Sequence, residues 1–244
     1  MERESLKEHR AYTFLAQGRT SFAGKPLNAH AIADSSTGNF QKESIDNTLD
    51  PSERAGRIAL HWSSTGQRNP AVPETLTYKL DGDLFVINEI KIQPFQDFSQ
   101  RSRPIYSAKT VRFRMGHVKR PLDVLQDSVH DSFVWTYTSE ELPMAQENCL
   151  QNFKLPEPVP CIGGIMQVEL LGKVFPKLSP KFFLLLLACC SVAHVQILGR
   201  GRSLAHAFRV DNDEPEDPVN DWGLLATELY VSSFCFCACI TMEL

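Results

Sequence analysis

The chain has 244 residues, a formal net charge of -4, a hydrophobic content of 43% and a charged content of 22%. This composition is ordinary for a globular protein, and the weak acidic balance provides no basic field for nucleic acid or an anionic membrane. Fifteen prolines and thirteen glycines favour many turns and short strands over long helices.

The N-terminal region is predicted to be a short helix followed by a loop. Residues 1–18 form the helix, which is too short to be stable unless it docks. The stretch 19–43 is rich in Ser, Thr, Gly and Asn and is interpreted as a loop. Trp62 is predicted to pack in the core, because a single Trp usually buries its large apolar area; a ligand-stacking role is the alternative. The apolar positions of the helix are Leu6, Tyr12, Phe14 and Leu15.

The stretch 73–95 is predicted to form a β-hairpin. Leu76, Tyr78 and Leu80 alternate with polar residues, as in a strand with one buried face. The turn is Asp81-Gly82-Asp83, because Gly tolerates the positive φ that tight turns require. The returning run contains many β-branched residues, which pack well on a pleated surface, and Pro94 ends it.

Five further strands are expected, with turns between them and no alternation of strands and helices. In the first of them, Val111, Phe113 and Met115 face inward, whereas Arg112 and Arg114 face outward. Four prolines between 139 and 160 exclude a long helix there and restrict the expected strand to 150–155. This pattern predicts a mostly β fold, an antiparallel sandwich. The five strands are expected at 105–115, 133–137, 150–155, 165–171 and 194–198.

The last third of the chain has an unusual composition. The apolar run 182–190 has the sequence FFLLLLACC, which is far shorter than the roughly 20 residues of a membrane span, so a buried strand is favoured. Residues 211–218 are acidic and interpreted as a solvated linker. Cys235, Cys237 and Cys239 alternate without a second ligand pair, which favours apolar side chains over a zinc site.

No motif in the sequence carries catalytic chemistry. The seven histidines are scattered, and His194 is interpreted as a satisfied core or edge residue. Glu140 and Glu141 are adjacent, so on a strand they point to opposite faces and make a poor acid–base pair. We therefore predict no catalytic, cofactor-binding or metal-binding residues and no enzymatic activity. The charged N-terminus has no apolar signal region, and the seven cysteines form no disulfide framework, which predicts a cytoplasmic or nuclear protein.

Several runs closely resemble a plant F-box protein family. The resemblance covers roughly residues 9–172 and 192–200, and it implies a substrate-receptor subunit of a Skp1–cullin–F-box ubiquitin ligase. It also implies a C-terminal galactose-binding-like, discoidin-like sandwich of jelly-roll type. The longest matching runs are NPAVPETLTYKL at 69–80, PIYSAKTVRFRMGH at 104–117, PMAQENCLQNFKLPEP at 143–158 and CIGGIMQVELLG at 161–172, with WTY at 135–137 and HVQILG at 194–199.

The chain departs from this family in two places. Only eight residues precede His9, which leaves no room for the helical F-box, so a truncated form without direct Skp1 contact is expected. Residues 173–191 and those after 201 do not match the family pattern, from which we infer an altered gene model or splice form. Sequencing transcripts across codons 170–245 tests this, and reads that match this frame throughout would refute it.

The expected function is therefore non-enzymatic protein recognition, related to the substrate-receptor part of an F-box protein, whose partner is a protein substrate of the ligase. The alternative is an intracellular glycan-binding, lectin-like module. Binding is expected on rim loops of the sandwich, because loops vary freely on a rigid scaffold. The predicted domains are an N-terminal helix and loop (1–30), a β-sandwich (31–200) and a divergent tail (201–244) with an acidic linker and an apolar Cys-rich segment. The candidate loops are 34–48, 61–72, 96–104 and 116–131.

Overall fold

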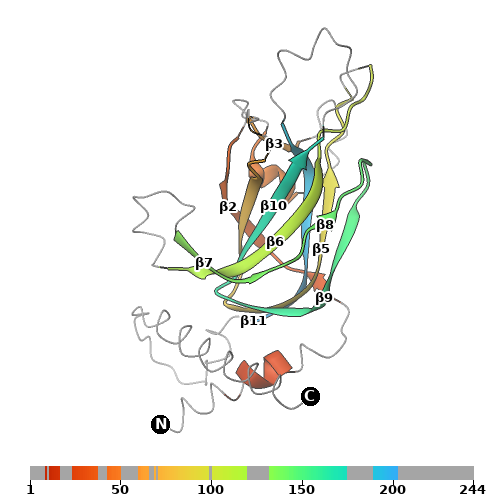
Figure 1. Ribbon diagram of the computed structural model, residues 1–244. Coiled ribbons are helices and arrows are strands. Elements are labelled where there is room, and N and C mark those ends of the chain that lie inside the picture. The colour runs from red at the N-terminus through yellow and green to blue at the C-terminus, as the bar shows by residue number, and fades with distance from the viewer. Residues whose placement is uncertain are drawn as a thin grey trace.

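The computed structural model describes residues 9, 11–16, 24–37, 43–50, 60–65, 69, 71–98, 101–119, 132–174 and 189–202. Its strands form two antiparallel sheets, one of five strands and one of six, that pack face to face (Figure 1). The predicted fold class, a mostly β antiparallel sandwich with a short N-terminal helix, is therefore confirmed.

The five-stranded sheet, here named the β5 sheet, has β11 and β5 at its centre. Its strand order is β1 (Lys25–Pro26), β11 (Ser191–Arg202), β5 (Leu84–Pro94) and β9 (Gln151–Ile162), and β3 (Trp62–Ser63) also pairs with β11.

The six-stranded sheet, here named the β10 sheet, covers the other side of the core. Its order is β2 (Ala29–Asp34), β4 (Glu74–Leu80), β10 (Ile165–Lys173), β6 (Ala108–Val118) and β7 (Phe133–Thr138), and β8 (Leu142–Pro143) also pairs with β6. The 3-10 helix η1 (Ile45–Thr48) lies between β2 and β3 in the sequence.

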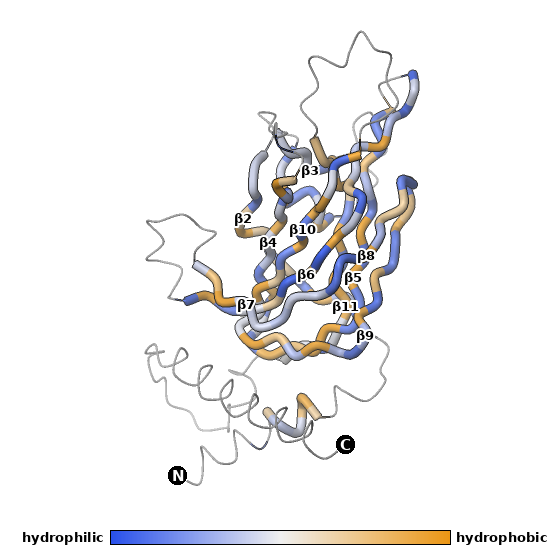
Figure 2. The backbone as a smooth tube through the Cα atoms, in the orientation of Figure 1, coloured by the Kyte–Doolittle hydropathy of each residue, from blue (hydrophilic) through white to orange (hydrophobic). Residues whose placement is uncertain are grey.

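The core lies between the sheets and follows the alternation that the sequence predicted. Val111, Phe113 and Met115 of β6 are fully buried, whereas the side chains of Arg112 and Arg114 stay partly exposed on the outer face. Each fully buried side chain of this size stabilises the fold by roughly 1.5–3 kcal/mol through removal of apolar area from water. Figure 2 shows the same alternation of hydrophobic and hydrophilic residues along the strands.

The predicted hairpin at 73–95 was wrong in its pairing, although both strands are present. β4 pairs with β2 and β10, and β5 pairs with β11 and β9, so the two strands belong to opposite sheets. Residues 81–83 therefore form an arch across the end of the sandwich, and the backbone N–H of Asp81 donates to Asn28 O at 3.0 Å. An Asp-Gly signal marks a change of direction, but it does not determine whether the next strand joins the same sheet or the facing one.

One loop prediction was also wrong, and one predicted strand is longer than expected. Residues 25–26 and 29–34, within the expected loop 19–43, form β1 and β2, because their backbone groups complete the ladders of β11 and β4. The strand expected at 150–155 extends from Gln151 to Ile162 through three prolines. Because β9 is an edge strand, one side needs no ladder donors, and its register also shifts opposite the Ile87–Glu89 segment of β5.

The N-terminal helix docks, as predicted. Residues 11–16 are helical, and Ala11 and Phe14 are buried against Leu84 and Val86 on the outer face of β5. The Arg200 guanidinium lies 5.3 Å from the centre of the Phe14 ring. Tyr12, which was expected on the apolar side, is 38% exposed.

Other predictions fall outside the described residues. They concern the apolar run 182–188, the acidic linker 211–218 and the three alternating cysteines of the tail. The division into domains 1–30, 31–200 and 201–244 stays a prediction. None of the described helices is long and apolar enough to cross a membrane.

Candidate functional site: the loop end and its buried polar cluster

Most of the connecting segments leave the sandwich at one end, here named the loop end. At this end β2 and β10 finish and β4 begins, since β2 and β10 both run antiparallel to β4. β5 also finishes here, where its terminal residue Pro94 pairs with Val192 near the start of β11. The candidate loops 34–48, 61–72 and 96–104 therefore gather at the loop end, in their described parts. The fourth candidate, 116–131, starts at the opposite end, where Val118 pairs with Phe133.

A buried ion pair closes the core at the loop end. The Lys173 Nζ lies 2.8 Å from Glu74 Oε1, and the side chains of the two residues are 1% and 0% exposed. Glu74 points inward because it has the same phase along β4 as Leu76 and Tyr78, which are both core residues. Strict alternation along β10 would direct Lys173 outward, but Gly172 has φ 63°, which interrupts the alternation.

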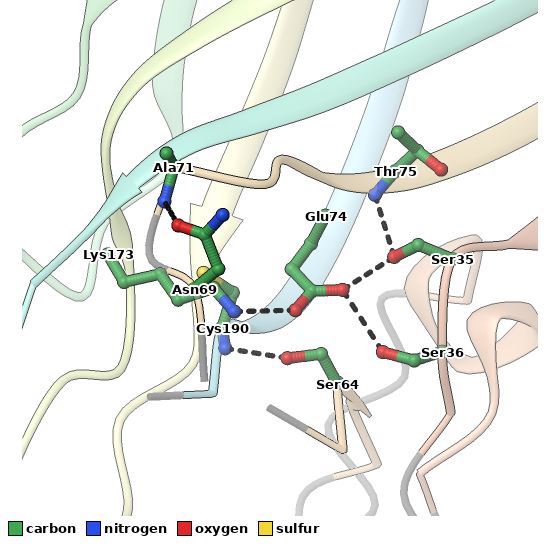
Figure 3. A network of polar contacts seen from close by, with 9 residues as sticks. All are labelled: Ser35, Ser36, Ser64, Asn69, Ala71, Glu74, Thr75, Lys173 and Cys190. Atoms are coloured by element: carbon green, nitrogen blue, oxygen red, sulfur yellow. Dashed lines mark hydrogen bonds and ion pairs between the residues drawn. The ribbon is translucent and has the colours of Figure 1, made fainter. Parts of the chain in front are cut away.

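Hydroxyl groups complete the coordination of the Glu74 carboxylate. Ser35 Oγ and Ser36 Oγ donate to Glu74 Oε2 at 2.6 and 3.0 Å, and Ser35 Oγ in turn accepts the backbone N–H of Thr75 at 3.0 Å. Figure 3 shows these groups converging on one carboxylate from β4, β10 and the end of β2. Removing two charges from water is costly, so the pair depends on these additional hydrogen bonds. Its structural effect is to fix the exit of β2 relative to β4 and β10.

Two neighbouring cysteines lie beside this cluster but are poor nucleophiles. Burial raises the pKa of the Cys190 thiol to about 12, and the negative charge of Glu74 acts in the same direction. Burial likewise raises the pKa of the Cys189 thiol. The thiolate is the reactive form of cysteine, so at neutral pH both side chains stay protonated and unreactive. Cys190 is held by its backbone, whose N–H donates to Ser64 Oγ at 3.0 Å.

Two residues that the sequence analysis weighed for binding or catalysis, Trp62 and His194, have structural roles. Trp62 is fully buried and its Nε1 donates to Asp34 Oδ2 at 3.0 Å, so the packing prediction is confirmed. The Nδ1 of His194 is 2.8 Å from the carbonyl oxygen of Thr48, so this histidine is a satisfied buried residue, as predicted. His61 stacks on Phe95, with ring centroids 3.6 Å apart.

The outer face of the β10 sheet carries a second polar network. Arg112 Nε and Arg114 Nη2 lie 2.5 and 3.1 Å from the two carboxylate oxygens of Glu169, whose side chain is only 4% exposed. The Arg114 guanidinium also lies 6.0 Å from the Trp135 ring centre. These contacts neutralise Glu169 and tie β6 to β10, which is a structural role.

Sequence reasoning missed the Glu74–Lys173 pair. Half of it was recoverable, because Glu74 shares the period-two face of three apolar residues and must therefore point into the core. Lys173 was not recoverable, since it is 99 residues away in the sequence and reaches the pair through a local break in alternation. No group of three or more His, Cys, Asp or Glu residues that could hold a metal ion occurs within the described ranges.

The comparison with curated proteins identifies a relative of the chain. Over 218 residues, or 84% of this chain, it is 47% identical to the F-box protein At4g00755 of Arabidopsis thaliana. This chain is a homologue of a plant F-box protein. It spans 56% of that protein's length. No family model matches the chain.

Solved structures with a similar arrangement of strands include carbohydrate-binding modules, an F5/8 type C domain and an allantoicase. The family 32 carbohydrate-binding module of Clostridium perfringens NanJ, solved with galactose, is 13% identical, with a TM-score of 0.47 over 72% of this chain and 98% of that module. The F5/8 type C domain of a Bacteroides fragilis protein is 10% identical, with a TM-score of 0.46 over 73% of this chain and 98% of that domain. At these scores the likeness says nothing about the ligand of this chain.

Proposed function

We propose that this chain is a non-enzymatic protein-recognition module, related to the substrate-receptor part of an F-box protein in a Skp1–cullin–F-box ubiquitin ligase. The observation that carries the proposal is the 47% identity to an F-box protein over 84% of the chain. An identity of this level over most of the sandwich supports a common ancestral role for it. The partner would be a protein substrate of the ligase, in the cytoplasm or nucleus.

The architecture suits recognition by loops on a rigid support. The Glu74–Lys173 pair and its serine hydroxyls hold the ends of β2, β4 and β10 together at the loop end. Binding residues on loops that a rigid scaffold positions lose little freedom when a partner binds. Burial raises the pKa of the Cys189 and Cys190 thiols, so these two side chains are not activated nucleophiles at neutral pH, which is consistent with a surface for contact.

A carbohydrate is the second candidate ligand, and one observation favours it. Phe98, on the loop that follows β5, leaves 59% of its surface exposed. An aromatic ring presents a flat apolar face together with a specific geometry, which suits the apolar face of a sugar ring.

Affinity capture tests the first proposal. The tagged chain is expressed in plant cells, and captured proteins are identified by mass spectrometry, alongside a chain in which the exposed loop-end residues Val72, Phe98 and Leu150 are changed to Ser. A matched control changes Tyr12, an equally exposed side chain of the N-terminal helix, to Ser. We expect a specific partner protein that is lost with the loop-end variant, is retained with the control and binds the purified chain directly.

Two results would overturn the proposal. One is the absence of any protein that binds the purified chain directly. The other is recovery of Skp1 as the sole specific partner, which would indicate an adaptor contact without substrate recognition. A glycan array probed with the same purified chain tests the second candidate, and an array without signal rejects it.

A further inference from the structure

A projecting segment at the loop end carries the most exposed large hydrophobic side chain of the described residues. The described residues 95–98 and 101–107, together named the finger, lie between β5 and β6 and pair with each other, since Gln96 bridges Ile105 and the N–H of Asp97 donates to Pro104 O at 2.9 Å. Phe98 lies on this finger and is 59% exposed. Burying such a ring removes a large apolar area from water, so leaving it exposed is a cost to the isolated chain.

A second loop supports the finger from the side. The segment 144–150, here named the step, precedes β9, and because Gln151 pairs with Ile92, it leaves the sheet next to the end of β5. Asn148 of the step joins the two segments, since its Oδ1 accepts from Gln93 Nε2 at 3.0 Å and its Nδ2 donates to Gln96 Oε1 at 3.3 Å. The step carries a further exposed apolar side chain, Leu150, which is 40% exposed.

The backbone of the finger is strained at the residue that faces Phe98. Arg103 has φ 45°, and it is the sole non-glycine residue with positive φ among the described residues. Its guanidinium lies 5.7 Å from the Phe98 ring centre, and its carbonyl oxygen accepts from Gln96 Nε2 at 3.0 Å. A glycine would occupy this conformation without strain, whereas the Cβ of an arginine is crowded there. Backbone strain of this kind is concentrated at functional positions.

The charge of the finger indicates the chemistry of its partner. Arg101 and Arg103 are both exposed on it, close to Phe98 in the sequence, and they outnumber its one acidic residue, Asp97; the step carries one acidic residue, Glu147. Aromatic and arginine side chains are the residue types that dominate the centres of protein interfaces. A carboxylate complements the two guanidinium groups, and an apolar side chain complements the ring.

We propose that the finger and the step together bind a segment of a partner protein that presents a carboxylate beside an apolar side chain. Phe98 and Leu150 supply the apolar contacts and Arg103 supplies the charge. This inference rests on the proposed recognition function and assigns that function to a defined surface. The hydrogen bonds through Asn148 hold the surface in place before binding, which reduces the entropy that binding costs.

A selection from a random peptide library, displayed on phage and applied to the full chain, tests this surface. We expect enriched peptides in which Asp or Glu lies within a few residues of an apolar or aromatic residue. Binding of a selected peptide, measured by fluorescence anisotropy, should weaken about tenfold or more in Phe98→Ala and in Arg103→Gly, as for residues at the centre of an interface. Arg103→Gly is the sharper variant, because it relieves the backbone strain and so preserves or raises stability while binding is lost.

The matched control is Tyr12→Ser, which removes an exposed apolar side chain from the N-terminal helix, 38% exposed. This variant should bind the peptides as the unchanged chain does. Charge reversal gives a second readout. In a second peptide, Lys replaces the acidic residue of the selected peptide, and Arg103→Glu should bind this second peptide more tightly than the selected one.

The proposal would be overturned by peptides that lack acidic residues or by peptides that bind Phe98→Ala normally. It would also be overturned if Phe98→Ala abolished binding to a glycan or to phosphatidylserine vesicles while no peptide bound. If captured partner proteins bind directly but ignore Phe98 and Arg103, the recognition function stands and this surface is wrong. If no partner protein binds directly, the recognition function itself fails.

Discussion

Removing one member of the Glu74–Lys173 pair should destabilise the sandwich severely, and removing both should cost no more than removing one. Glu74→Gln keeps the shape of the side chain and an acceptor for Ser35 and Ser36, but it leaves the Lys173 ammonium buried without a countercharge. Lys173→Met keeps an unbranched side chain that is one atom shorter, and it leaves the Glu74 carboxylate buried with hydroxyl partners alone. The double variant buries neither charge.

The expected magnitudes follow from the burial of the pair. Both side chains are 1% exposed or less, so water cannot screen an unpaired charge. Breaking a buried pair from one side costs about 3–5 kcal/mol, whereas replacing both members with neutral residues is often close to neutral. We expect about 3 kcal/mol lost in each single variant and no more than that in the double variant, which is a coupling energy of at least about 3 kcal/mol. Because single domains are stable by only about 5–15 kcal/mol, either single loss is a large fraction of the total.

The assay is equilibrium urea unfolding of the four proteins, followed by far-ultraviolet circular dichroism at neutral pH with a reductant to keep the cysteines as thiols. Lys91→Met serves as a matched control, because Lys91 of β5 lies on the outer face and stays partly exposed. Its unfolding free energy should change by less than about 0.5 kcal/mol, as for most surface substitutions. If the double variant loses the sum of the two single losses, the charges do not compensate each other and the reasoning is refuted.

Three further outcomes are expected. Burial raises the pKa of the Cys161 and Cys190 thiols from 9.0 to about 12, so the folded chain binds more protons than the unfolded chain between these values and stability falls as pH rises. Each thiol should lower the free energy of unfolding by about 1.4 kcal/mol between neutral pH and pH 10. In Cys161→Ala, urea unfolding should show this decrease reduced by the contribution of one thiol; a decrease equal to that of the unchanged chain would contradict this. Gly116→Ala should cost more than about 2 kcal/mol by the same assay, because a Cβ there would lie 1.9 Å from Val134 O of β7, and unaltered stability would count against the β6–β7 register. Phe14→Ala should release the N-terminal helix, with a loss of about 3 kcal/mol in the stability of its contact with β5, and hydrogen exchange in residues 11–16 should become faster. Tyr12→Ala removes an exposed side chain, so an equal effect of that variant would argue against docking through Phe14.

The sequence alone determined the fold class, the positions of most strands and the face of each strand that is buried. The side chains at 111, 113 and 115 alternate with arginines, and period two converts directly into inward and outward faces. The same local rule identified the docking helix and placed Trp62 in the core. These features depend on residues that are close together in the sequence, so a segment of about ten residues is enough to predict them.

Tertiary structure decided which strands pair, and through that pairing it formed the loop end. The segments before and after Asp81-Gly82-Asp83 look like a hairpin in sequence, yet β4 and β5 each have two neighbours from elsewhere in the chain, so they cannot pair with each other. The Glu74–Lys173 pair and the bridge from Asn148 to Gln93 and Gln96 join residues far apart in the sequence. Their energies depend on burial and on distances between atoms, which are fixed only when the two sheets close on each other.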